Sequence, residues 1–318
     1  PAVKFVPTFA FPFLRRKPLY VFNLFLNLRF FDLIKEDVLI VHDPFHFWPV
    51  IWKKNVIVLS HGVRWDRPSA RERYYNKVHH LSARLALKYA PKLVANDSHF
   101  FRRLGLNVKP KTNMFKEVAK NHWFIPNCVD THYFTKNEGV PNLKKLKLIL
   151  VPRNIVPGRG IHLVIQAFMI FWKKFPDTTL AVVGDFVDEH YKSTIFSLIN
   201  EYNLQGRVIF LGFVKNNKMP DIYSSALMSV IPTVYEEGTS LAALESMACG
   251  TATVSTNVGG LADLPTLQSE PQAENLAEIM TSCFLKREVL AKEQQAEVAK
   301  TYNMENFRSA WYQVIKSS

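Results

Sequence analysis

Short apolar runs that end in polar residues recur along the chain, and such runs predict buried parallel strands. In the first part of the chain they cover residues 37–43, 55–61 and 92–96. Between the last two runs, residues 68–89 place apolar side chains at helical spacing among basic ones, which predicts a helix. Strands that alternate with helices are typical of a doubly wound α/β sheet.

The same pattern returns in the second part of the chain, after polar residues over 135–145 that predict a linker. Five further apolar runs cover residues 146–151, 179–183, 208–211, 226–231 and 252–254. A helix is predicted over 160–175, with others between the later strands, so we expect a second doubly wound sheet. Residues 303–316 carry Phe307, Trp311 and Val314 near helical spacing and predict a terminal helix.

The length of 318 residues exceeds one typical domain and favours two. The three cysteines are odd in number and widely spaced, which argues against a disulfide scaffold or a zinc site and favours a reducing cytosol. The uncharged run at 18–28 is too short to span a bilayer, and the opening residues lack the pattern of a secretory signal. The chain begins with Pro1, so we expect a fragment or a processed product.

The positive charge is confined to one part of the chain. Residues 1–125 hold 22 Lys and Arg against 8 Asp and Glu, whereas residues 126–318 hold 18 against 19. The first part also mixes aromatic side chains with basic ones, namely Phe5, Phe9, Phe11, Phe13 and Phe22 with Arg15, Arg16 and Lys17. This mixture favours an anionic membrane surface over a nucleic acid. The alternative is a solvated basic surface over buried aromatics.

Residues 235–250 combine two carboxylates with a predicted helix start. The strand over 226–231 is followed by a loop and by a helix over 241–249, with Glu237 before the first turn and Glu245 inside the helix. Thr239 or Ser240 can cap this helix, and its free N–H groups favour an anion in the loop. Carboxylates beside an anion site suit a sugar linked to a phosphate. The alternative is a surface helix with an ordinary acidic first turn.

The continuation over 251–260 favours the ligand site. It reads as another short strand followed by Gly259 and Gly260, which allow a backbone to approach a ligand closely. A helix between two buried strands is a βαβ unit, and ligands bind at the carboxyl ends of its strands.

These residues resemble a known family. The run from Glu237 to Glu245, followed by Met-Ala-Cys-Gly at 247–250 and Val-Gly-Gly-Leu at 258–261, resembles the Glu-x7-Glu signature of retaining GT-B glycosyltransferases, specifically glycosyltransferase family 4. The resemblance implies a GT-B fold, in which two doubly wound Rossmann-like domains face a cleft. We therefore expect an acceptor-side and membrane-side domain over 1–134, a nucleotide-sugar domain over 146–302, and a terminal helix over 303–318 that packs toward the domain interface.

The start of the first domain departs from the family pattern. Members usually open with a strand, a glycine-rich loop, a helix and a second strand, and none of these precedes Val38. Roughly sixty residues of a usual first domain are missing, judged by the length of a βαβ unit. We expect a domain that is truncated or unusually small.

The resemblance first assigns roles within residues 151–160. The family usually carries an Arg and a Lys five residues apart that neutralise the donor diphosphate. Here Asn154 takes the Arg position, Arg153 lies one residue earlier, and Arg159 replaces the Lys. An Arg keeps the charge and can bind a phosphate through two N–H groups.

The remaining roles follow the family motif residue by residue. Glu237 would lie by the donor sugar, the backbone N–H groups of Thr239, Ser240 and Leu241 would meet sugar and phosphate, and Glu245 would take the ribose hydroxyls. His61, at the end of a predicted strand, resembles the family histidine that faces the donor sugar. Gly184 ends another strand and would contact the base or ribose; the alternative there is a simple turn.

We therefore predict a retaining hexosyltransferase that moves a hexose or deoxyhexose from a UDP- or GDP-sugar to an acceptor hydroxyl, in glycan or glycolipid assembly such as polysaccharide biosynthesis. The catalytic residues would be Glu237, Arg153, Arg159 and His61, with no metal and no cofactor besides the donor. The expected partners are a glycan or lipid-linked acceptor and an anionic membrane, not nucleic acid, with a cytoplasmic location peripheral to the membrane. The main alternative is a non-catalytic nucleotide-sugar-binding partner or remnant of such an enzyme, and a sugar-nucleotide epimerase is a weaker one.

Overall fold

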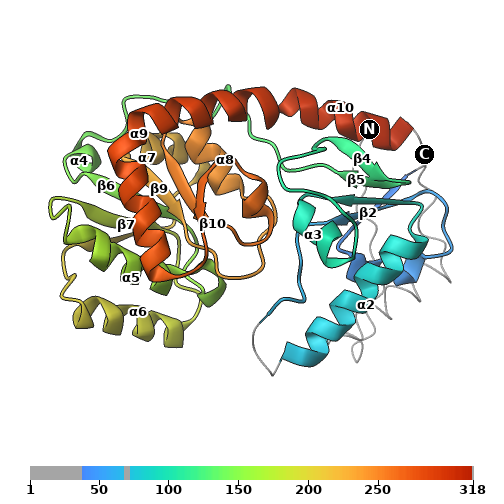
Figure 1. Ribbon diagram of the computed structural model, residues 1–318, viewed down its shortest axis with the longest axis horizontal. Coiled ribbons are helices and arrows are strands. Elements are labelled where there is room, and N and C mark those ends of the chain that lie inside the picture. Colours follow the sequence, from blue (N-terminus) through green and yellow to red (C-terminus); the bar gives the residue numbers. More distant parts are fainter. Residues whose placement is uncertain (1–37, 68–71, 317–318) are drawn as a thin grey trace.

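The computed structural model describes residues 38–67 and 72–316, which form two sheets side by side (Figure 1). The aromatic and basic segment that suggested a membrane surface lies outside these residues. No helix within the described ranges combines the length and the apolar character needed to cross a membrane.

The N-terminal sheet has five strands in the order β1-β2-β3-β5-β4. Their bounds are β1 Leu39–His42, β2 Val56–Ser60, β3 Lys92–Ala95, β4 Lys116–Ala119 and β5 His122–Phe124. All pairs are parallel except β4 with β5, which are antiparallel. The predicted strands β1, β2 and β3 are confirmed, whereas β4 was not predicted because its exposed residues form no apolar run.

Different helices cover the two faces of this sheet. On one face, Val56 and Val58 of β2 pack with residues of α2 (Arg73–Tyr89) and α3 (Ser98–Arg103). Ile57 and Leu59 point to the other face, because side chains alternate along a strand. There they pack against Ala310 and Val314 of α10 (Met304–Lys316), the last helix of the chain.

The C-terminal sheet has six parallel strands in the order β11-β10-β9-β6-β7-β8. Their bounds are β6 Leu148–Pro152, β7 Thr179–Val183, β8 Val208–Gly212, β9 Met228–Ile231, β10 Thr253–Thr256 and β11 Leu267–Ser269. The five strands predicted from apolar runs are present within a few residues of their expected ends. The short, half-buried β11 was not predicted.

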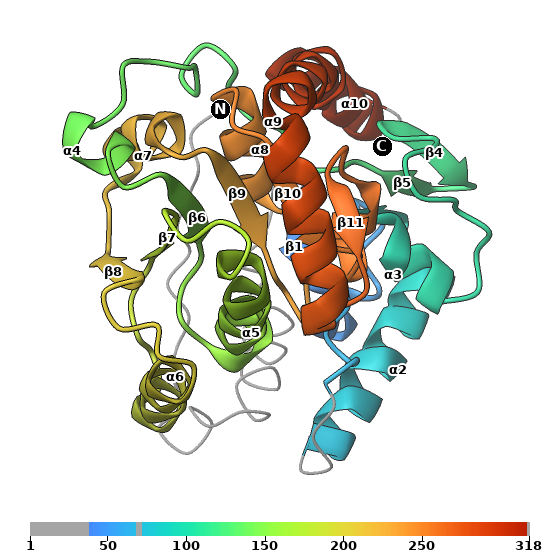
Figure 2. The ribbon, with the colours of Figure 1, turned by 60° about the vertical axis from the view of Figure 1, so that its left-hand side comes forward.

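Helices cover both faces of the C-terminal sheet, as Figure 2 shows. The helices of this half are α4 Pro141–Lys144, α5 Ile161–Trp172, α6 Glu189–Glu201, α7 Met219–Ser225, α8 Leu241–Ala248 and α9 Ala273–Thr301. Short 3-10 helices are η2 Pro44–His46, η3 Trp48–Val50, η5 Pro157–Arg159, η6 Asn216–Lys218 and η7 Gly259–Asp263. Along β6, Ile149 and Val151 pack with α5, α6 and α9, while Leu148 and Leu150 pack with α7 and α8.

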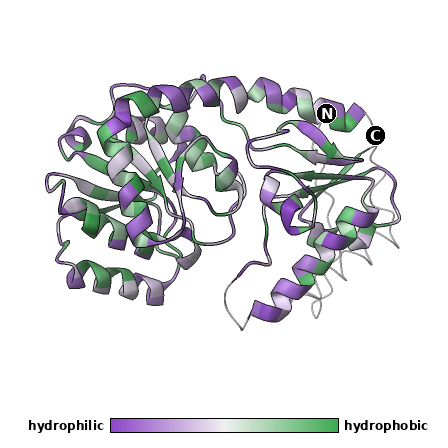
Figure 3. Cartoon of the chain, in the orientation of Figure 1, coloured by the Kyte–Doolittle hydropathy of each residue, from purple (hydrophilic) through white to green (hydrophobic). Residues whose placement is uncertain are grey.

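The apolar strands thus lie between amphipathic helices in both halves of the molecule (Figure 3). The 29-residue helix α9 runs along the C-terminal sheet, and α10 continues from it across to the N-terminal sheet (Figure 1). In this arrangement the carboxyl ends of the strands of both sheets face each other. Gly238 of the C-terminal half and His61 of the N-terminal half lie next to each other there.

Candidate functional site

Two arginines converge on Glu237 at the carboxyl end of the C-terminal sheet. Arg153 follows β6, Arg159 ends η5, and Glu237 lies in the loop between β9 and α8. Glu237 Oε2 accepts hydrogen bonds from Arg153 Nη2 at 2.6 Å, from Arg159 Nη1, and from Thr233 Oγ1 at 2.9 Å. The strand ends of a parallel sheet meet at one edge, so residues 84 apart in sequence come into contact.

This cluster is buried unevenly. The side chains of Arg153 and Glu237 are 9% and 7% exposed, whereas that of Arg159 is 34% exposed. Burial lowers the pKa of Arg153, and the nearby Glu237 carboxylate opposes that shift. Arg153 Nε is buried and has no hydrogen-bond acceptor among the described residues.

Glu245 lies within α8, beyond Glu237 in the chain. Its Oε2 accepts a hydrogen bond from the Tyr223 hydroxyl at 2.9 Å. Burial raises the pKa of the Glu245 carboxyl, which the Tyr223 bond and Arg153 oppose, and burial also raises the pKa of Tyr223. Tyr223 comes from α7, and no motif in the sequence marked it.

The prediction that a side chain of Thr239 or Ser240 caps α8 is wrong. Ser240 occupies the N-cap position, but its hydroxyl makes no capping hydrogen bond and is buried without a partner among the described residues. The Thr239 hydroxyl instead donates to the backbone carbonyl of Asn96, in the N-terminal half. The Thr239 hydroxyl, which could have capped the helix, therefore donates across the cleft instead.

A cavity of 290 Å³ lies between the two halves at this point. Its lining residues are His61, Gly62, Val63, Arg64, Asn96, Asn127, Arg159, Glu236, Glu237, Gly238 and Thr239. Asn127 spans the cleft, because its Nδ2 donates to the carbonyl of Thr239 at 2.9 Å. Gly238 is required here, since a Cβ at that position would lie 2.6 Å from the carbonyl oxygen of His61 and 2.7 Å from Asn96 Oδ1.

His61 follows β2 and is hydrogen-bonded to another histidine. Its Nε2 lies 3.0 Å from Nδ1 of His42, the last residue of β1. Burial lowers the pKa of His61, and His42 and Arg64 lower it further, while Asp43 opposes them. His61 is thus predominantly neutral at neutral pH and can donate or accept a hydrogen bond.

The other predicted ligand-contacting residues lie in different surroundings. Asn154 and Leu241 are exposed and line no part of the 290 Å³ cavity. Gly184 packs against the backbone of Arg153 and Asn154 with a φ of 148°, so a side chain there would collide with the loop that carries Arg153. Gly184 therefore allows the loop that carries Arg153 to pack closely against it. This close packing is the reason that a glycine stands at the end of the strand.

The structure adds contacts across the cleft that the sequence did not indicate. Arg67 Nε donates to Glu236 Oε1 at 2.6 Å, and Glu236 has a positive φ of 57°. Ser98, at the start of α3, donates from its hydroxyl to Asp263 Oδ1 at 2.6 Å and from its backbone to Oδ2 at 2.8 Å. Both pairs join residues more than 160 positions apart, so no local pattern could reveal them.

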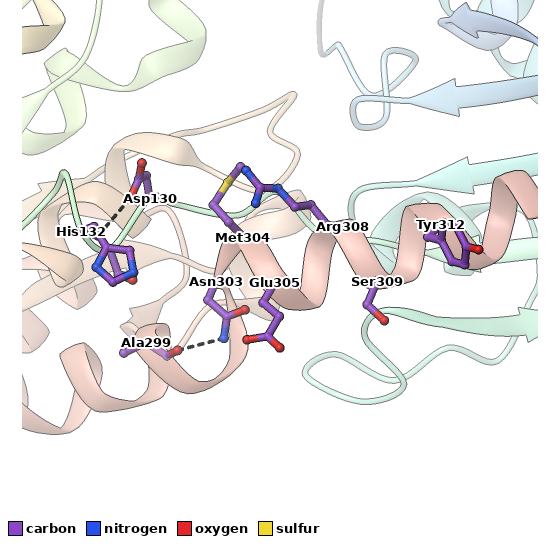
Figure 4. Close-up of a pocket in the computed structure, with 10 residues that line it drawn as sticks. Asp130, His132, Ala299, Asn303, Met304, Glu305, Arg308, Ser309 and Tyr312 are labelled. Carbon is purple, nitrogen blue, oxygen red and sulfur yellow. Dashed lines mark hydrogen bonds between the residues drawn. The ribbon is translucent and has the colours of Figure 1, made fainter. Parts of the chain in front are cut away.

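A larger cavity lies away from the cluster. It has a volume of 880 Å³ and lies where the segment after Asp130 meets α10, and its labelled side chains, among them His132, Met304 and Arg308, come from that crossing (Figure 4). None of the predicted site residues lines it. We place the site at the arginine cluster because Arg153 and Arg159 converge on Glu237 there. Within residues 38–67 and 72–316, no three His, Cys, Asp or Glu side chains are grouped so as to hold a metal ion.

The C-terminal half of the chain is similar to known proteins. Residues 134–287 match the family described as "Glycosyl transferases group 1". Mannosylfructose-phosphate synthase of Agrobacterium fabrum is 30% identical over 152 residues, which cover 44% of this chain and 33% of that protein. The gpi3 subunit of the phosphatidylinositol N-acetylglucosaminyltransferase of Schizosaccharomyces pombe is 26% identical over 188 residues, which cover 56% and 40%. The chain thus spans well under half the length of these relatives.

Solved structures show the fold of the whole described chain. HepE of Anabaena, in complex with UDP, superposes with a TM-score of 0.72 over 95% of this chain and 82% of that one, at 16% identity. Sucrose-phosphate synthase of Thermosynechococcus elongatus gives 0.73 over 95% and 78%, at 19% identity. The C-terminal domain of a group 1 glycosyl transferase of Francisella tularensis, LpcC, matches 55% of this chain and 99% of that one, with a TM-score of 0.50 and 25% identity.

These likenesses confirm the predicted GT-B fold of two doubly wound α/β sheets. The family match and the curated relatives relate the C-terminal half to the group 1 glycosyl transferases, in agreement with the sequence resemblance. The assignment to family 4, the stereochemical course and the domain boundaries at 134, 146 and 302 stay predictions.

Proposed function

We propose that this chain transfers a sugar from a nucleotide-diphosphate sugar to an acceptor hydroxyl, with the donor held by the C-terminal half. The observation that carries the proposal is the convergence of Arg153 and Arg159 on Glu237 beside the start of α8, at the wall of a 290 Å³ cavity. Two guanidinium groups and a helix N-terminus stabilise a diphosphate, and a buried carboxylate binds sugar hydroxyls. HepE, whose structure contains UDP, has the same fold.

In the proposed complex the diphosphate competes with Glu237 for the arginines. Arg159 is one-third exposed and can turn toward the phosphate, while Arg153 offers its unpartnered Nε. Glu237 then accepts hydrogen bonds from the donor sugar, with Thr233 still holding its carboxylate. Glu245 takes the ribose hydroxyls, the N–H groups of residues 239–241 meet sugar and phosphate, and Asn154 and Gly184 border the nucleoside.

The chemical step follows from this placement. The bond from the anomeric carbon to the diphosphate oxygen breaks, and a bond to the acceptor oxygen forms on the same side of the sugar. The acceptor proton passes to the departing diphosphate. Because negative charge develops on that diphosphate, neutralisation by Arg153 and Arg159 is the main contribution of the protein, with His61 binding a sugar hydroxyl from the N-terminal half.

The finer assignments belong to the same proposal. We infer a retaining course, a hexose or deoxyhexose donor carried by UDP or GDP, and an acceptor that is a glycan or a lipid-linked glycan. The excess of positive charge over residues 1–125 supports a cytoplasmic protein that binds the anionic face of a membrane. Flotation with anionic liposomes tests that point, because binding should weaken as salt rises.

The test is sugar transfer from a panel of UDP- and GDP-hexoses, measured with variants at Arg159. Arg159→Ala should lower kcat by about 100-fold, the usual effect of removing one charge-stabilising donor. Arg159→Lys keeps the charge and should retain most of the activity. Lys174→Ala, at an exposed position after α5, is the matched control and should equal the wild type.

Two outcomes overturn the proposal. Donor binding in the micromolar range with no transfer or hydrolysis would identify a non-catalytic nucleotide-sugar-binding protein instead. Equal activity of the Arg159→Ala and Lys174→Ala variants would remove the arginine cluster from the mechanism.

A further inference from the structure

The rings of His42 and His61 share a hydrogen bond at the cleft end of the N-terminal sheet. Nδ1 of His42 lies 3.0 Å from Nε2 of His61. The ring planes differ by only 11°, and the ring centroids are 5.3 Å apart. With a nitrogen contact of 3.0 Å, this centroid separation means that the rings lie edge to edge in nearly one plane. That is the geometry of an N–H donor pointing at an in-plane lone pair, not of two stacked faces.

The backbone on both sides holds His42 in this position. β1 and β2 pair in parallel with His42 opposite Leu59, two residues before His61. The next residue, Asp43, has a positive φ of 91°, its backbone N–H donates to the carbonyl of Leu59 at 2.8 Å, and its carboxylate accepts from the backbone N–H of Phe45. A non-glycine residue at positive φ persists only where its surroundings fix it. The register of the strands and this fixed turn therefore set the distance between the two rings.

Charged groups on the adjoining loops complete the surroundings. Asp43 forms an ion pair with Arg64 Nε at 2.9 Å, and His46 Nδ1 lies 3.3 Å from the carbonyl oxygen of His42. Arg159 and Glu237 line the cavity that His61 also lines. Burial, His42 and Arg64 disfavour a cationic His61, with Asp43 opposing them. A proton on both bridging nitrogens would break the bond between the rings. When the two rings are hydrogen-bonded, one proton therefore lies between Nδ1 of His42 and Nε2 of His61.

We propose that His42 is a positioning residue for His61: by engaging Nε2 it fixes the orientation of the ring and leaves Nδ1 as the ring nitrogen that binds a sugar hydroxyl. This inference rests on the proposed function, in which His61 contacts the donor sugar. His42 acts on the sugar only through His61. The tautomer of His61 is coupled to that of His42, because Nδ1 of His61 is a donor when His42 donates to Nε2 and an acceptor when Nε2 donates to His42.

The first test is independent of activity. Nitrogen-15 NMR of the histidine rings, with His61 assigned by His61→Gln, should show Nε2 of His61 in a hydrogen bond with Nδ1 of His42 in the wild-type chain at pH 7.5. His42→Asn places an amide where Nδ1 was and should preserve a hydrogen bond to Nε2. His42→Ala should remove that hydrogen bond and raise the pKa of His61 toward its ordinary value, because the cation of His61 loses a neighbour that disfavours it. A wild-type spectrum without this hydrogen bond, or an unchanged spectrum in His42→Ala, overturns the inference.

The second test is a double-mutant cycle on sugar transfer. His42→Ala should lower kcat about tenfold, the lower end of the effect seen for outer partners of functional histidines, with little change in KM for the donor. Combined with His61→Ala it should cause no further loss, because its effect passes through His61. Additive losses, or failure of His42→Asn to restore kcat, would show a purely structural role. If no variant and no wild-type chain transfers sugar, the proposed function fails while the NMR test still decides the pairing.

Discussion

The two sheets are built alike, but their cores are completed in different ways. In the C-terminal half, both faces of the sheet are covered by helices that belong to the same stretch of chain, and the arginine cluster forms from its own loops. In the N-terminal half, one face is covered by α10, which returns from the far end of the sequence. Most of the C-terminal core therefore comes from one segment of the chain, and residues 134–287 of that segment match the family. The N-terminal half depends on a distant segment for its core and contributes mainly the polar ends of its strands.

The largest effect is expected from a large-to-small change in the C-terminal core. Phe168 is fully buried between α5 and the sheet, so Phe168→Ala should lower the free energy of unfolding by about 3–5 kcal/mol. Phe213→Ala, at a residue 70% exposed, is the control. Hydrogen exchange should show lost protection in β7 with little change in β2. Equal losses in both strands would mean that the halves unfold together and that their cores are not independent.

A somewhat smaller effect is expected in the arginine cluster. Glu237→Ala leaves the buried Arg153 without its carboxylate and should cost about 3 kcal/mol, the lower end for an uncompensated buried charge. Addition of UDP or GDP should stabilise this variant more than the wild type, since a diphosphate supplies the missing anion. Glu236→Ala, which removes a more exposed ion pair with Arg67, should cost less than about 1 kcal/mol. Equal costs at the two glutamates in chemical denaturation would contradict the burial of the Arg153 pair.

The dependence of the N-terminal half on α10 is tested by Val314→Ala. Val314 is fully buried against the sheet, and loss of two methyl-sized groups should cost about 1.5 kcal/mol at ~0.8 kcal/mol each. Hydrogen exchange should locate the loss in β2 and β3. The neighbouring Ile315→Ala, at 44% exposure, should be nearly neutral. A loss centred on β7 instead would show that α10 belongs to the C-terminal core.

The smallest effect concerns the contact between the halves near Asp97. Burial, together with the Asp263 carboxyl across the contact, raises the pKa of Asp97 to about 7, against the opposing effects of the Phe100 backbone N–H, His99 and Arg102. A carboxyl with a raised folded-state pKa binds its proton more tightly in the folded chain. The free energy of unfolding should therefore fall as pH rises from about 4 through about 7.

Asp97→Asn removes this ionisation and keeps an oxygen that can cap α3 at the backbone N–H of Phe100. Between about pH 6 and pH 7 the variant should lose about 1 kcal/mol less than the wild type. Denaturation at several pH values measures the difference, with the exposed Asp177→Asn as control. A variant with the same pH dependence as the wild type would exclude Asp97 as the titrating group.

The sequence predicted most strands because a buried strand leaves a local mark, an apolar run closed by polar residues. It also marked Glu237 and Arg159 as candidate ligand-binding residues through their places in a motif. It did not predict β4, in which two residues are exposed and two are half-buried, or α9, in which charged residues interrupt the apolar stripe. The predicted cap for α8 was wrong, because local spacing marks a hydroxyl near a helix start but not the carbonyl of Asn96 that competes for it.

By itself, then, the sequence determined two α/β sheets, the loop and helix that hold Glu237, and the glycines around it, since periodicity and motif spacing are properties of adjacent residues. Only the tertiary structure decided that Arg153 and Arg159 meet on Glu237, that Tyr223 holds Glu245, and that His42 pairs with His61. These contacts depend on the order of strands in each sheet and on the closeness of the two halves. Both arise from long-range packing, in which a side chain's partner is set by the fold and not by its neighbours in the chain.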